Sequence, residues 1–343
     1  LGSGVVLDFR NQRRRTEGDG GTAADGGSTG SGGSNSMSVT GNGFTIDNLT
    51  IKNSPGDGIR VTNAQNVTFR RLRVSWDAGS VTANGAYAIY PVGCTRVLIE
   101  DCEVRGASDA GIYVGQSSRV IVRRNKAIAN VAGIEIENTT DSDVYDNEAT
   151  DNTGGILVFN LPNLPVGDGR RALLRNNNVH DNNRANFAER GTTVAGVPPG
   201  TGVLVMAADQ TEVRNNTIRN NNTVGVVVVD YRTANSGTIR DMAYNTLPEG
   251  TWIHDNTFTS NGTDPHGDLA GAVPARPVED ILWDGRVDPM RAGDAAARTC
   301  VTNNTGARFR NFNFEDLGSQ STDLARVNCM LTPLPTIAAF TGQ

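Results

Sequence analysis

The sequence of 343 residues has few of the residues that mark several common classes of protein. It has three histidines and four cysteines, and no Cys-x-x-Cys pair, so the usual zinc and thioredoxin-like spacings are absent. The formal net charge is −6, which argues against a general binder of nucleic acid or of anionic membranes. No apolar run approaches the ~18 residues that a membrane-spanning helix needs.

The composition also disfavours coiled coils and helical bundles. The chain contains 40 glycines and 35 asparagines, and both residues are poor helix formers. Hydrophobic residues make up 37% of the chain, which is enough for a sizeable core. The length allows one large domain or two ordinary ones.

A short motif recurs along the chain: a glycine, then two hydrophobic residues that flank one variable position (Gly-Φ-x-Φ). Its copies begin at Gly58, Gly111, Gly133, Gly155, Gly202 and Gly225, with a degenerate copy at 88–90. From residue 88 onward the spacings are 23, 22, 22, 47 and 23 residues. The repeat therefore has a period of 22–23 residues, with one long insertion at 159–200, where Pro and Gly predict an irregular loop.

Two further strand-like segments follow each copy. The second is short and hydrophobic, and the third follows a Φ-x-x-Asn-x-Φ pattern whose asparagines stand at 125, 147, 177, 216 and 256. Three short strands per ~22 residues predict one rung of a parallel β-helix. A leucine-rich repeat is the rival at this period, but it would need leucines at fixed spacing where Val, Ile and Gly dominate.

In a β-helix, inward side chains stack on the equivalent position one rung away, about 4.8 Å distant. The asparagines of the third pattern should therefore point inward and form a hydrogen-bonded ladder. Earlier copies place Leu49, Leu72 and Cys102 in this column, so we expect Cys102 to be a buried, inert thiol. The sequence does not commit Cys94 to a partner.

We predict a β-helix over residues 1–263 and an irregular C-terminal cap over 264–343, where the period is lost and the open strand edge needs cover. Residues 10–40 are Arg-rich and then Gly/Ser-rich, which predicts a flexible loop. Cys300 and Cys329 both lie in the cap, and we expect them to form a disulfide in an oxidising compartment; two free thiols are the alternative. No signal peptide is visible, so any such segment is removed or left out.

These repeats resemble the right-handed parallel β-helix of the pectin-lyase-like superfamily. Segments 85–92, 106–116, 132–138, 152–158 and 281–285 are similar to a family of secreted bacterial parallel β-helix repeat proteins. The resemblance runs from about residue 40 to the C-terminal tail. It implies an all-β, three-sheet solenoid that is secreted, periplasmic or on the cell surface, but it implies no particular activity.

The variable position of Gly-Φ-x-Φ should point out of the solenoid, because both Φ side chains point in. This column and its flanks gather aromatic, cationic and acidic side chains on four successive rungs. We expect substrate binding at Asp57, Tyr87, Tyr90, Tyr113 and Gln116, and chemistry at Arg60, Asp109, Glu135 and Glu137. Rings beside carboxylates are typical of a sugar-binding groove; solvated residues and ordinary cross-strand tyrosine pairs are the alternative.

Glu135 and Glu137 lie two residues apart on one strand, so their backbones are about 6.6–7 Å apart. Inverting glycosidases separate their carboxyls by about 6.5–9.5 Å. Asp109, on the adjacent rung, could be the closer partner of Glu135, and two near carboxylates would raise one pKa. The same group could hold Ca²⁺, and Arg60 could stabilise developing negative charge.

Later rungs carry Leu157, Leu204 and Val227 at the variable position, which predicts an apolar face against the 159–200 insertion or another protein. On the second sheet an outward column rich in arginine predicts ion pairs, with an anion-binding stripe as the alternative.

The segment Asp264-Pro265-His266-Gly267-Asp268 is similar to the Asp-Pro-His-Asp motif of periplasmic mannuronan C5-epimerases, although Gly267 interrupts it. His266 is therefore a candidate general base, and a turn in the cap is the alternative.

Three classes of function fit these features. The first is an enzyme that acts on a polysaccharide by lyase, epimerase or hydrolase chemistry. The second is a noncatalytic carbohydrate-binding or scaffold protein. The third, a periplasmic metal-handling protein, is the weakest, because copper would favour clustered His, Met or Cys.

Overall fold

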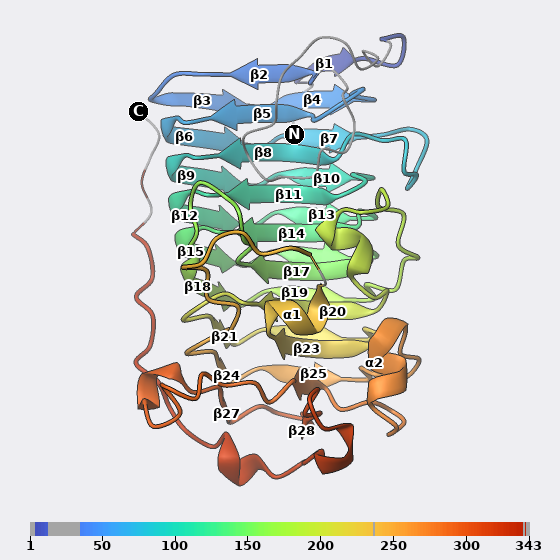
Figure 1. Cartoon of the computed structure of the whole chain (residues 1–343). Coiled ribbons are helices and arrows are strands. Elements are labelled where there is room, and N and C mark those ends of the chain that lie inside the picture. Colours follow the sequence, from blue (N-terminus) through green and yellow to red (C-terminus); the bar gives the residue numbers. More distant parts are fainter. Residues whose placement is uncertain (1–3, 13–34, 236, 339, 341–343) are drawn as a thin grey trace.

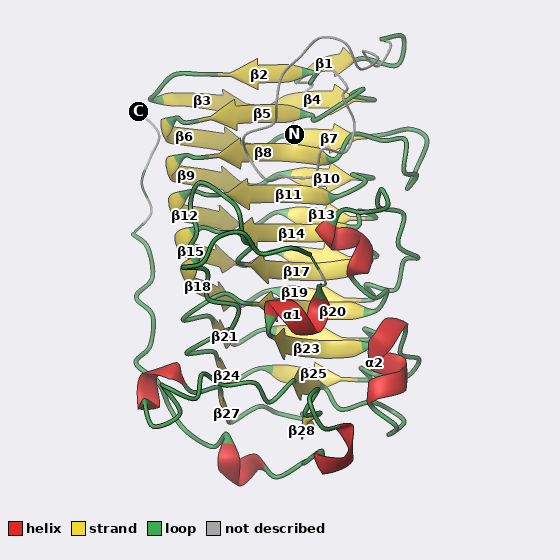
Figure 2. Ribbon diagram, viewed as in Figure 1, coloured by secondary structure: helices red, strands yellow, loops and turns green. Residues whose placement is uncertain are grey.

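The computed structural model describes residues 4–12, 35–235, 237–338 and 340. Short parallel strands are stacked in successive rungs of a single solenoid, and only short helices accompany them (Figure 1, Figure 2). Most rungs contribute one strand to each of three sheets, which we number in the order that the chain visits them. The prediction of an all-β, three-sheet parallel β-helix is confirmed.

The sheets have these strands. Sheet 1 contains β2 (Met37–Val39), β5 (Ile59–Thr62), β8 (Tyr87–Val92), β11 (Ala110–Gly115), β14 (Ala132–Glu137), β17 (Gly154–Phe159), β20 (Thr201–Met206), β23 (Val224–Val229), β26 (Ile281–Trp283) and β28 (Phe309–Asn311). Sheet 2 contains β3 (Phe44–Asp47), β6 (Gln65–Arg70), β9 (Thr95–Glu100), β12 (Ser118–Arg123), β15 (Thr140–Tyr145), β18 (Arg170–Arg175), β21 (Glu212–Arg214), β24 (Trp252–His254) and β27 (Cys300–Thr302). Sheet 3 contains β1 (Val5–Asp8), β4 (Leu49–Lys52), β7 (Arg73–Ser75), β10 (Glu103–Arg105), β13 (Lys126–Ile128), β16 (Glu148–Thr150), β19 (Asn178–His180), β22 (Thr217–Arg219) and β25 (Thr257–Thr259).

The helices are short and lie outside the sheets. They are η1 (Thr193–Gly196), α1 (Tyr231–Ala234), α2 (Gly267–Ala272), η2 (Ala295–Ala297), η3 (Leu317–Ser319) and η4 (Leu324–Arg326). Among the described residues, no helix has the length and apolar character needed to cross a membrane.

The interior of the solenoid is a stack of β-branched and aliphatic side chains. In sheet 1, Ile89, Ile112, Ile134 and Ile156 occupy one column on four neighbouring strands, and each is at most 1% exposed. β-branched residues suit such columns because they fill a pleated surface with little loss of rotamer freedom.

The predicted asparagine ladder is present at the turn between sheets 2 and 3. Asn125 Nδ2 donates to Asn147 Oδ1 at 3.0 Å and to the carbonyl of Ile99 at 3.0 Å. The same pattern continues from Asn147 to Asn177 and onward to Asn216, Asn256 and Asn304. Cys102 occupies the column one rung earlier, where its N–H donates to Asn125 Oδ1 at 2.9 Å, and it is buried as expected.

A second ladder, which we did not predict, lies five residues further along each rung. Asn130, Asn152, Asn182, Asn221 and Asn261 are joined by amide–amide bonds of 2.9–3.1 Å. The two ladders therefore hold both ends of the three-residue strands of sheet 3.

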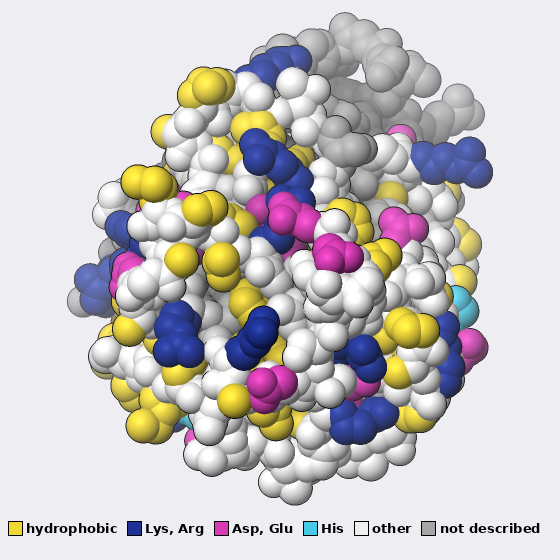
Figure 3. All heavy atoms as spheres, turned by 60° about the horizontal axis from the view of Figure 1, so that its bottom comes forward, with side chains coloured by type: hydrophobic (Ala, Val, Ile, Leu, Met, Phe, Trp, Pro, Cys, Tyr) yellow, Lys and Arg dark blue, Asp and Glu magenta, His cyan; other side chains and the backbone are white. Residues whose placement is uncertain are grey.

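The segment after residue 263 still contributes strands to the sheets. Its order is α2, β26, η2, β27, β28, η3 and η4. Figure 3 looks toward this end of the solenoid, where charged side chains of both signs lie close together and hydrophobic ones are scattered. Residues 13–34 of the predicted loop lie outside the described residues, and β2 forms within its last part.

The predicted disulfide between Cys300 and Cys329 is present, with an S–S distance of 2.01 Å. Cys94 and Cys102 are free and buried. Burial raises the pKa of both thiols, that of Cys102 to about 12, so neither is a reactive thiolate at neutral pH.

We predict that Asn147→Ala lowers the free energy of unfolding by about 1–3 kcal/mol, because it leaves buried partners in both adjacent rungs unsatisfied. Urea unfolding measures the change. Asn178→Ala, on the next rung, is the control, since no hydrogen bond of its side chain is found among the described residues. Equal midpoints for the two variants would show that the ladder does not stabilise the fold.

We predict that alkylation of the native protein without reductant labels no cysteine. Denaturation should then expose two thiols, those of Cys94 and Cys102, and reduction should expose all four. Intact-mass spectrometry counts the labels. Rapid labelling of Cys300 or Cys329 before reduction would disprove the disulfide.

Candidate functional site

Strands β8, β11 and β14 of sheet 1 bring together the side chains that we predicted to act on a ligand. Tyr113 pairs in register with Glu135, and Gly115 pairs with Glu137. On the other side, Arg60 of β5 is in register with Tyr90 of β8. Parallel pairing one rung apart thus gathers residues that are 22 to 30 positions apart in the sequence.

Three tyrosines form the aromatic part of the site. The ring centroids of Tyr87 and Tyr90 are 4.4 Å apart, and that of Tyr113 lies 4.6 Å from Tyr87 and 4.9 Å from Tyr90. The guanidinium carbon of Arg60 lies 5.0 Å from the centre of the Tyr90 ring, within range of a cation–π interaction.

Two of these tyrosines contact carboxyl groups through their hydroxyls. Tyr113 Oη donates to Glu137 Oε1 at 2.6 Å, and Tyr87 Oη lies 3.4 Å from Asp109 Oδ2. Asp57 Oδ1 accepts the backbone N–H of Tyr87 at 3.3 Å. Glu135 Oε2 is buried and has no hydrogen-bond partner among the described residues.

This face points away from the solenoid interior, as predicted, but it is not open to solvent. Tyr113 is 0% exposed, Glu135 2%, Glu137 3% and Asp109 4%. We refer to Tyr87, Tyr90, Tyr113, Asp109, Glu135 and Glu137 as the carboxyl–tyrosine cluster.

Burial changes the acidity of the cluster. It raises the pKa of Glu135 well above its usual value, and the charges of Asp109 and Glu137 raise it further. Burial and the charge of Glu137 likewise raise the pKa of Asp109. A carboxyl in this environment holds its proton to a higher pH than a solvated one and can donate it, which is the property of a general acid.

Glu135 and Glu137 both lie on β14, two residues apart. The charge of Glu137 and a hydrogen bond between the two side chains add to the burial that raises the pKa of Glu135. The pairing of an acid and a base that we considered for an inverting glycosidase stays a prediction.

The remaining predicted residues lie at different distances from the cluster. Gln116 follows β11, is 8% exposed, and donates its backbone N–H to the carbonyl of Glu137 at 2.9 Å. His266 lies before α2, where its N–H donates to Thr223 Oγ1 and its ring nitrogen is 3.8 Å from Asp264. Thr223 precedes β23, which is three strands from β14, so His266 is not part of the cluster.

Beyond the cluster, the outer face of sheet 1 becomes apolar and is covered by loops. Leu157 and Leu204 belong to one buried group with Leu161, Val197 and Phe312, which come from loops 160–169 and 181–200 and from the segment after β28. A pocket of ≈ 100 Å³ remains there, between Phe159, Leu204 and Phe312. Phe159 is in register with Glu137 on the neighbouring strand, but no residue of the carboxyl–tyrosine cluster lines this pocket.

One further residue that positions a loop next to the cluster was missed by sequence analysis. Asn138, directly after Glu137, is fully buried and has a left-handed backbone with φ of 42°. Its side chain accepts the N–H of Leu161 at 2.7 Å and donates to the carbonyls of Leu161 and Val166. It therefore holds loop 160–169 next to β14. The only signal in the sequence was the residue type, because Asn adopts a positive φ more readily than most residues.

On sheet 2, the predicted ion pairs are present. Glu100 binds Arg70 Nε at 2.6 Å, Arg123 at 2.7 Å and Arg124 at 2.7 Å. Among the described residues, no group of three or more His, Cys, Asp or Glu is placed to hold a metal ion. The calcium site that we considered at the carboxylates therefore has no support from the geometry.

Comparison with known proteins defines the class. Residues 35–168 and 80–236 match the family described as "Right handed beta helix region". Because these matches span more than half of the chain, the chain belongs to that family, and its fold is that of a pectin-lyase-like, right-handed parallel β-helix. No curated protein matches the sequence.

Several solved structures are similar to the chain in fold. The periplasmic alginate epimerase AlgG matches with a TM-score of 0.50 and 15% identity, over 76% of this chain and 50% of that one. The A-module of the Azotobacter vinelandii mannuronan C-5 epimerase AlgE4 matches with a TM-score of 0.49 and 18% identity, over 78% and 74%. The chain spans half the length of AlgG, and at these identities the likeness shows the fold alone.

We predict that Glu135→Gln stabilises the protein at pH 7–8 relative to wild type, by roughly 1–3 kcal/mol. Because the pKa of Glu135 is raised in the folded protein, its contribution to the free energy of unfolding is fully present below about pH 4, the pKa range of a free carboxyl. This contribution is lost as the pH rises toward the pKa of the folded state. Thermal unfolding between pH 4 and 8 tests this, since the advantage of the variant should grow with pH.

The control for this series is Glu103→Gln, on sheet 3, where the carboxylate is 37% exposed and paired with Arg105. Its difference from wild type should not grow with pH as that of Glu135→Gln does. A constant difference between Glu135→Gln and wild type from pH 4 to 8 would mean that Glu135 ionises normally.

Proposed function

We propose that this protein is an extracytoplasmic carbohydrate-active β-helix protein that binds a glycan over sheet 1 at the carboxyl–tyrosine cluster. The observation that carries the proposal is the buried carboxyl of Glu135, one oxygen of which has no partner among the described residues. An unsatisfied buried polar atom costs about 1–3 kcal/mol, so its retention favours a functional role over a structural one.

The roles follow from the contacts. Tyr87, Tyr90 and Tyr113 offer rings to the apolar faces of sugars. Glu135 is the proton donor, and Glu137, which accepts a hydrogen bond from Tyr113 Oη, is the carboxyl beside it. Arg60 lies over the Tyr90 ring and would stabilise negative charge that develops on the substrate.

The similarity to AlgG supports the class of protein, because that structure is named as an alginate epimerase and has the same fold. The Cys300–Cys329 disulfide supports an oxidising compartment. Lyase, epimerase and hydrolase chemistry all include proton transfer by acid and base groups, so the reaction class is an outcome of the experiment below.

A noncatalytic glycan-binding protein is the second candidate. The mutual packing of the tyrosines favours it, because three packed rings and a carboxyl held by Tyr113 Oη can bind a glycan without any chemistry. The two candidates differ in whether product appears.

The test combines a glycan array with assays for new reducing ends, for unsaturated products and for sugar epimerisation. For an enzyme, we predict that Glu135→Gln lowers turnover at least 100-fold while binding remains, and that Tyr113→Ala weakens both. Glu103→Gln should match wild type. Binding that depends on Tyr113 without turnover in any variant would identify the noncatalytic protein, and no glycan binding at all would refute both candidates.

A further inference from the structure

The C-terminal segment after the disulfide lies along the outside of sheet 2. In Figure 1 it runs beside the edge of the solenoid, from the last rungs back toward the first. We call residues 330–338 and 340 the strap. Cys329 is bonded to Cys300 of β27, so the strap begins at a fixed point on the sheet that it follows.

The strap shows a period of three in its exposure. Leu331, Leu334, Ile337 and Phe340 are half-buried, whereas the described residues between them are exposed. A polyproline II helix has three residues per turn, and Pro333 and Pro335 favour that conformation. None of the backbone–backbone hydrogen bonds of the described residues involves the strap, as expected for polyproline II.

Carboxylates on sheet 2 bind the strap backbone instead. The N–H of Leu334 donates to Glu212 Oε2 at 2.5 Å, and the N–H of Ile337 donates to Asp143 Oδ2 at 3.2 Å. Glu212 and Asp143 are 2% and 0% exposed, and each is also ion-paired on the sheet, to Arg214 and Arg175 respectively. Both carboxylates are thus held in place for the N–H groups they accept.

The three-residue repeat of the strap matches the spacing of two rungs of sheet 2. Glu212 lies on β21 and Asp143 on β15, two strands apart in the sheet, which corresponds to about 9.6 Å. Three residues of polyproline II span about 9.3 Å. Two strands further on, Arg96 of β9 lies over the ring of Phe340, with 4.8 Å between the guanidinium carbon and the ring centre. One turn of the strap therefore advances two rungs.

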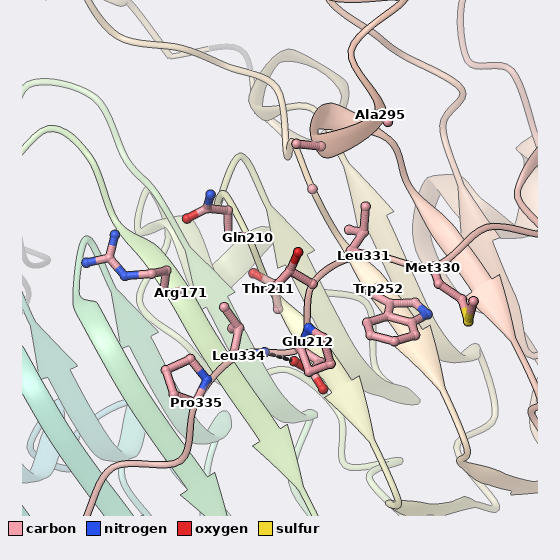
Figure 4. Close-up of a pocket in the computed structure, with 14 residues that line it drawn as sticks. Arg171, Gln210, Thr211, Glu212, Trp252, Ala295, Met330, Leu331, Leu334 and Pro335 are labelled. Carbon is pink, nitrogen blue, oxygen red and sulfur yellow. Dashed lines mark hydrogen bonds between the residues drawn. The ribbon is translucent and has the colours of Figure 1, made fainter.

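The face under the strap combines these carboxylates with apolar side chains. The column that contains Asp143 and Glu212 also contains Leu98, Ile121 and Leu173, which point outward and are at most 1% exposed. Near the start of the strap a pocket of ≈ 440 Å³ remains between Leu331, Leu334 and the sheet residues Arg171, Glu212 and Trp252 (Figure 4). The strap therefore fits the face without filling it.

We propose that the outer face of sheet 2 is a peptide-binding groove, and that it recognises an extended, proline-containing segment with an apolar side chain at every third residue. The strap is the occupant that the chain itself supplies. The groove binds backbone N–H groups through Glu212 and Asp143 and holds apolar side chains at a spacing of two rungs. This binding site is separate from the carboxyl–tyrosine cluster and does not depend on the function proposed for it.

The experiment measures binding of a fluorescent peptide with the sequence of residues 330–340 to three full-length proteins. These are wild type, Leu334→Asp/Ile337→Asp, which places acidic residues against Glu212 and Asp143, and the control Thr332→Ala/Thr336→Ala at exposed positions. A tethered strap competes at a high effective concentration. We therefore expect the Asp variant to bind the peptide at least tenfold more tightly than wild type and the control.

A second peptide separates groove recognition from nonspecific adhesion. The peptide that carries Leu334→Asp and Ile337→Asp should lose binding at least tenfold, whereas the peptide with Thr332→Ala and Thr336→Ala should bind like the parent. Hydrogen exchange of the wild-type protein should show slow amides at Leu334 and Ile337. Amides as fast as in the free peptide, no binding to the Asp variant at 1 mM peptide, or equal binding by all three proteins would overturn the proposal.

Discussion

The hydrogen bond from one buried asparagine amide to the next is the interaction on which the rest of the structure depends. The amide of each of these asparagines forms hydrogen bonds with the rungs on both sides, and it can do so only if the rungs are in register. The turn between sheets 2 and 3 is therefore short: two residues separate β12 from β13 and β15 from β16. The first residue of that turn has a left-handed backbone, as in Arg124 and Asp146 with φ of 54° and 55°.

This constraint decides where the chain can vary. Loops 160–169, 181–200, 230–251 and 260–280 all lie at turns that border sheet 1, and none interrupts the turn at the first ladder. Hydrophobic residues of these loops bury Leu157, Leu204 and Val227 on sheet 1. The outer face of sheet 2 is instead contacted by the strap.

Burial on sheet 1 gives the carboxyl–tyrosine cluster its chemical character. On an exposed strand Glu135 would be a solvated carboxylate. Beside Asp109 and Glu137, and with water excluded, its charged form is disfavoured and its proton is retained. Burial also raises the pKa of the Tyr113 hydroxyl, which therefore remains a donor to Glu137. Acidity in this site is thus set by the fold around it more than by residue type.

The features that were predictable from the sequence are those that repeat or act locally. The 22–23-residue period indicated the solenoid, and the recurrence of Asn125 and Asn147 indicated the first ladder. The second ladder was visible as an Asn five residues after each Asn of the first ladder, as in Asn147 and Asn152. Asn is also common in turns, so these positions did not by themselves indicate a ladder. The 159–200 insertion was expected over the apolar part of sheet 1, but the share of Tyr231 and Phe312 in this cover was not predictable, because they come from segments far from it in the chain.

The sequence showed which side chains share the outer face of sheet 1, since strand alternation places Tyr113 and Glu135 there. It could not show that the face is buried or that the pKa of Glu135 is raised, because both depend on side-chain packing. The strap was missed for a related reason: its period of three, at Leu331, Leu334 and Ile337, has meaning only beside the spacing of the rungs.

Infrared difference spectroscopy between wild type and Glu135→Gln tests most directly whether Glu135 holds a proton at neutral pH. The protonated carboxyl group has a carbonyl stretching band that the carboxylate lacks. We predict that the wild-type spectrum at pH 7 contains such a band, that it persists on titration above pH 6, and that the variant loses it. Identical spectra of the two proteins in this region at pH 7 would show that Glu135 is ionised, which would contradict its assignment as the proton donor.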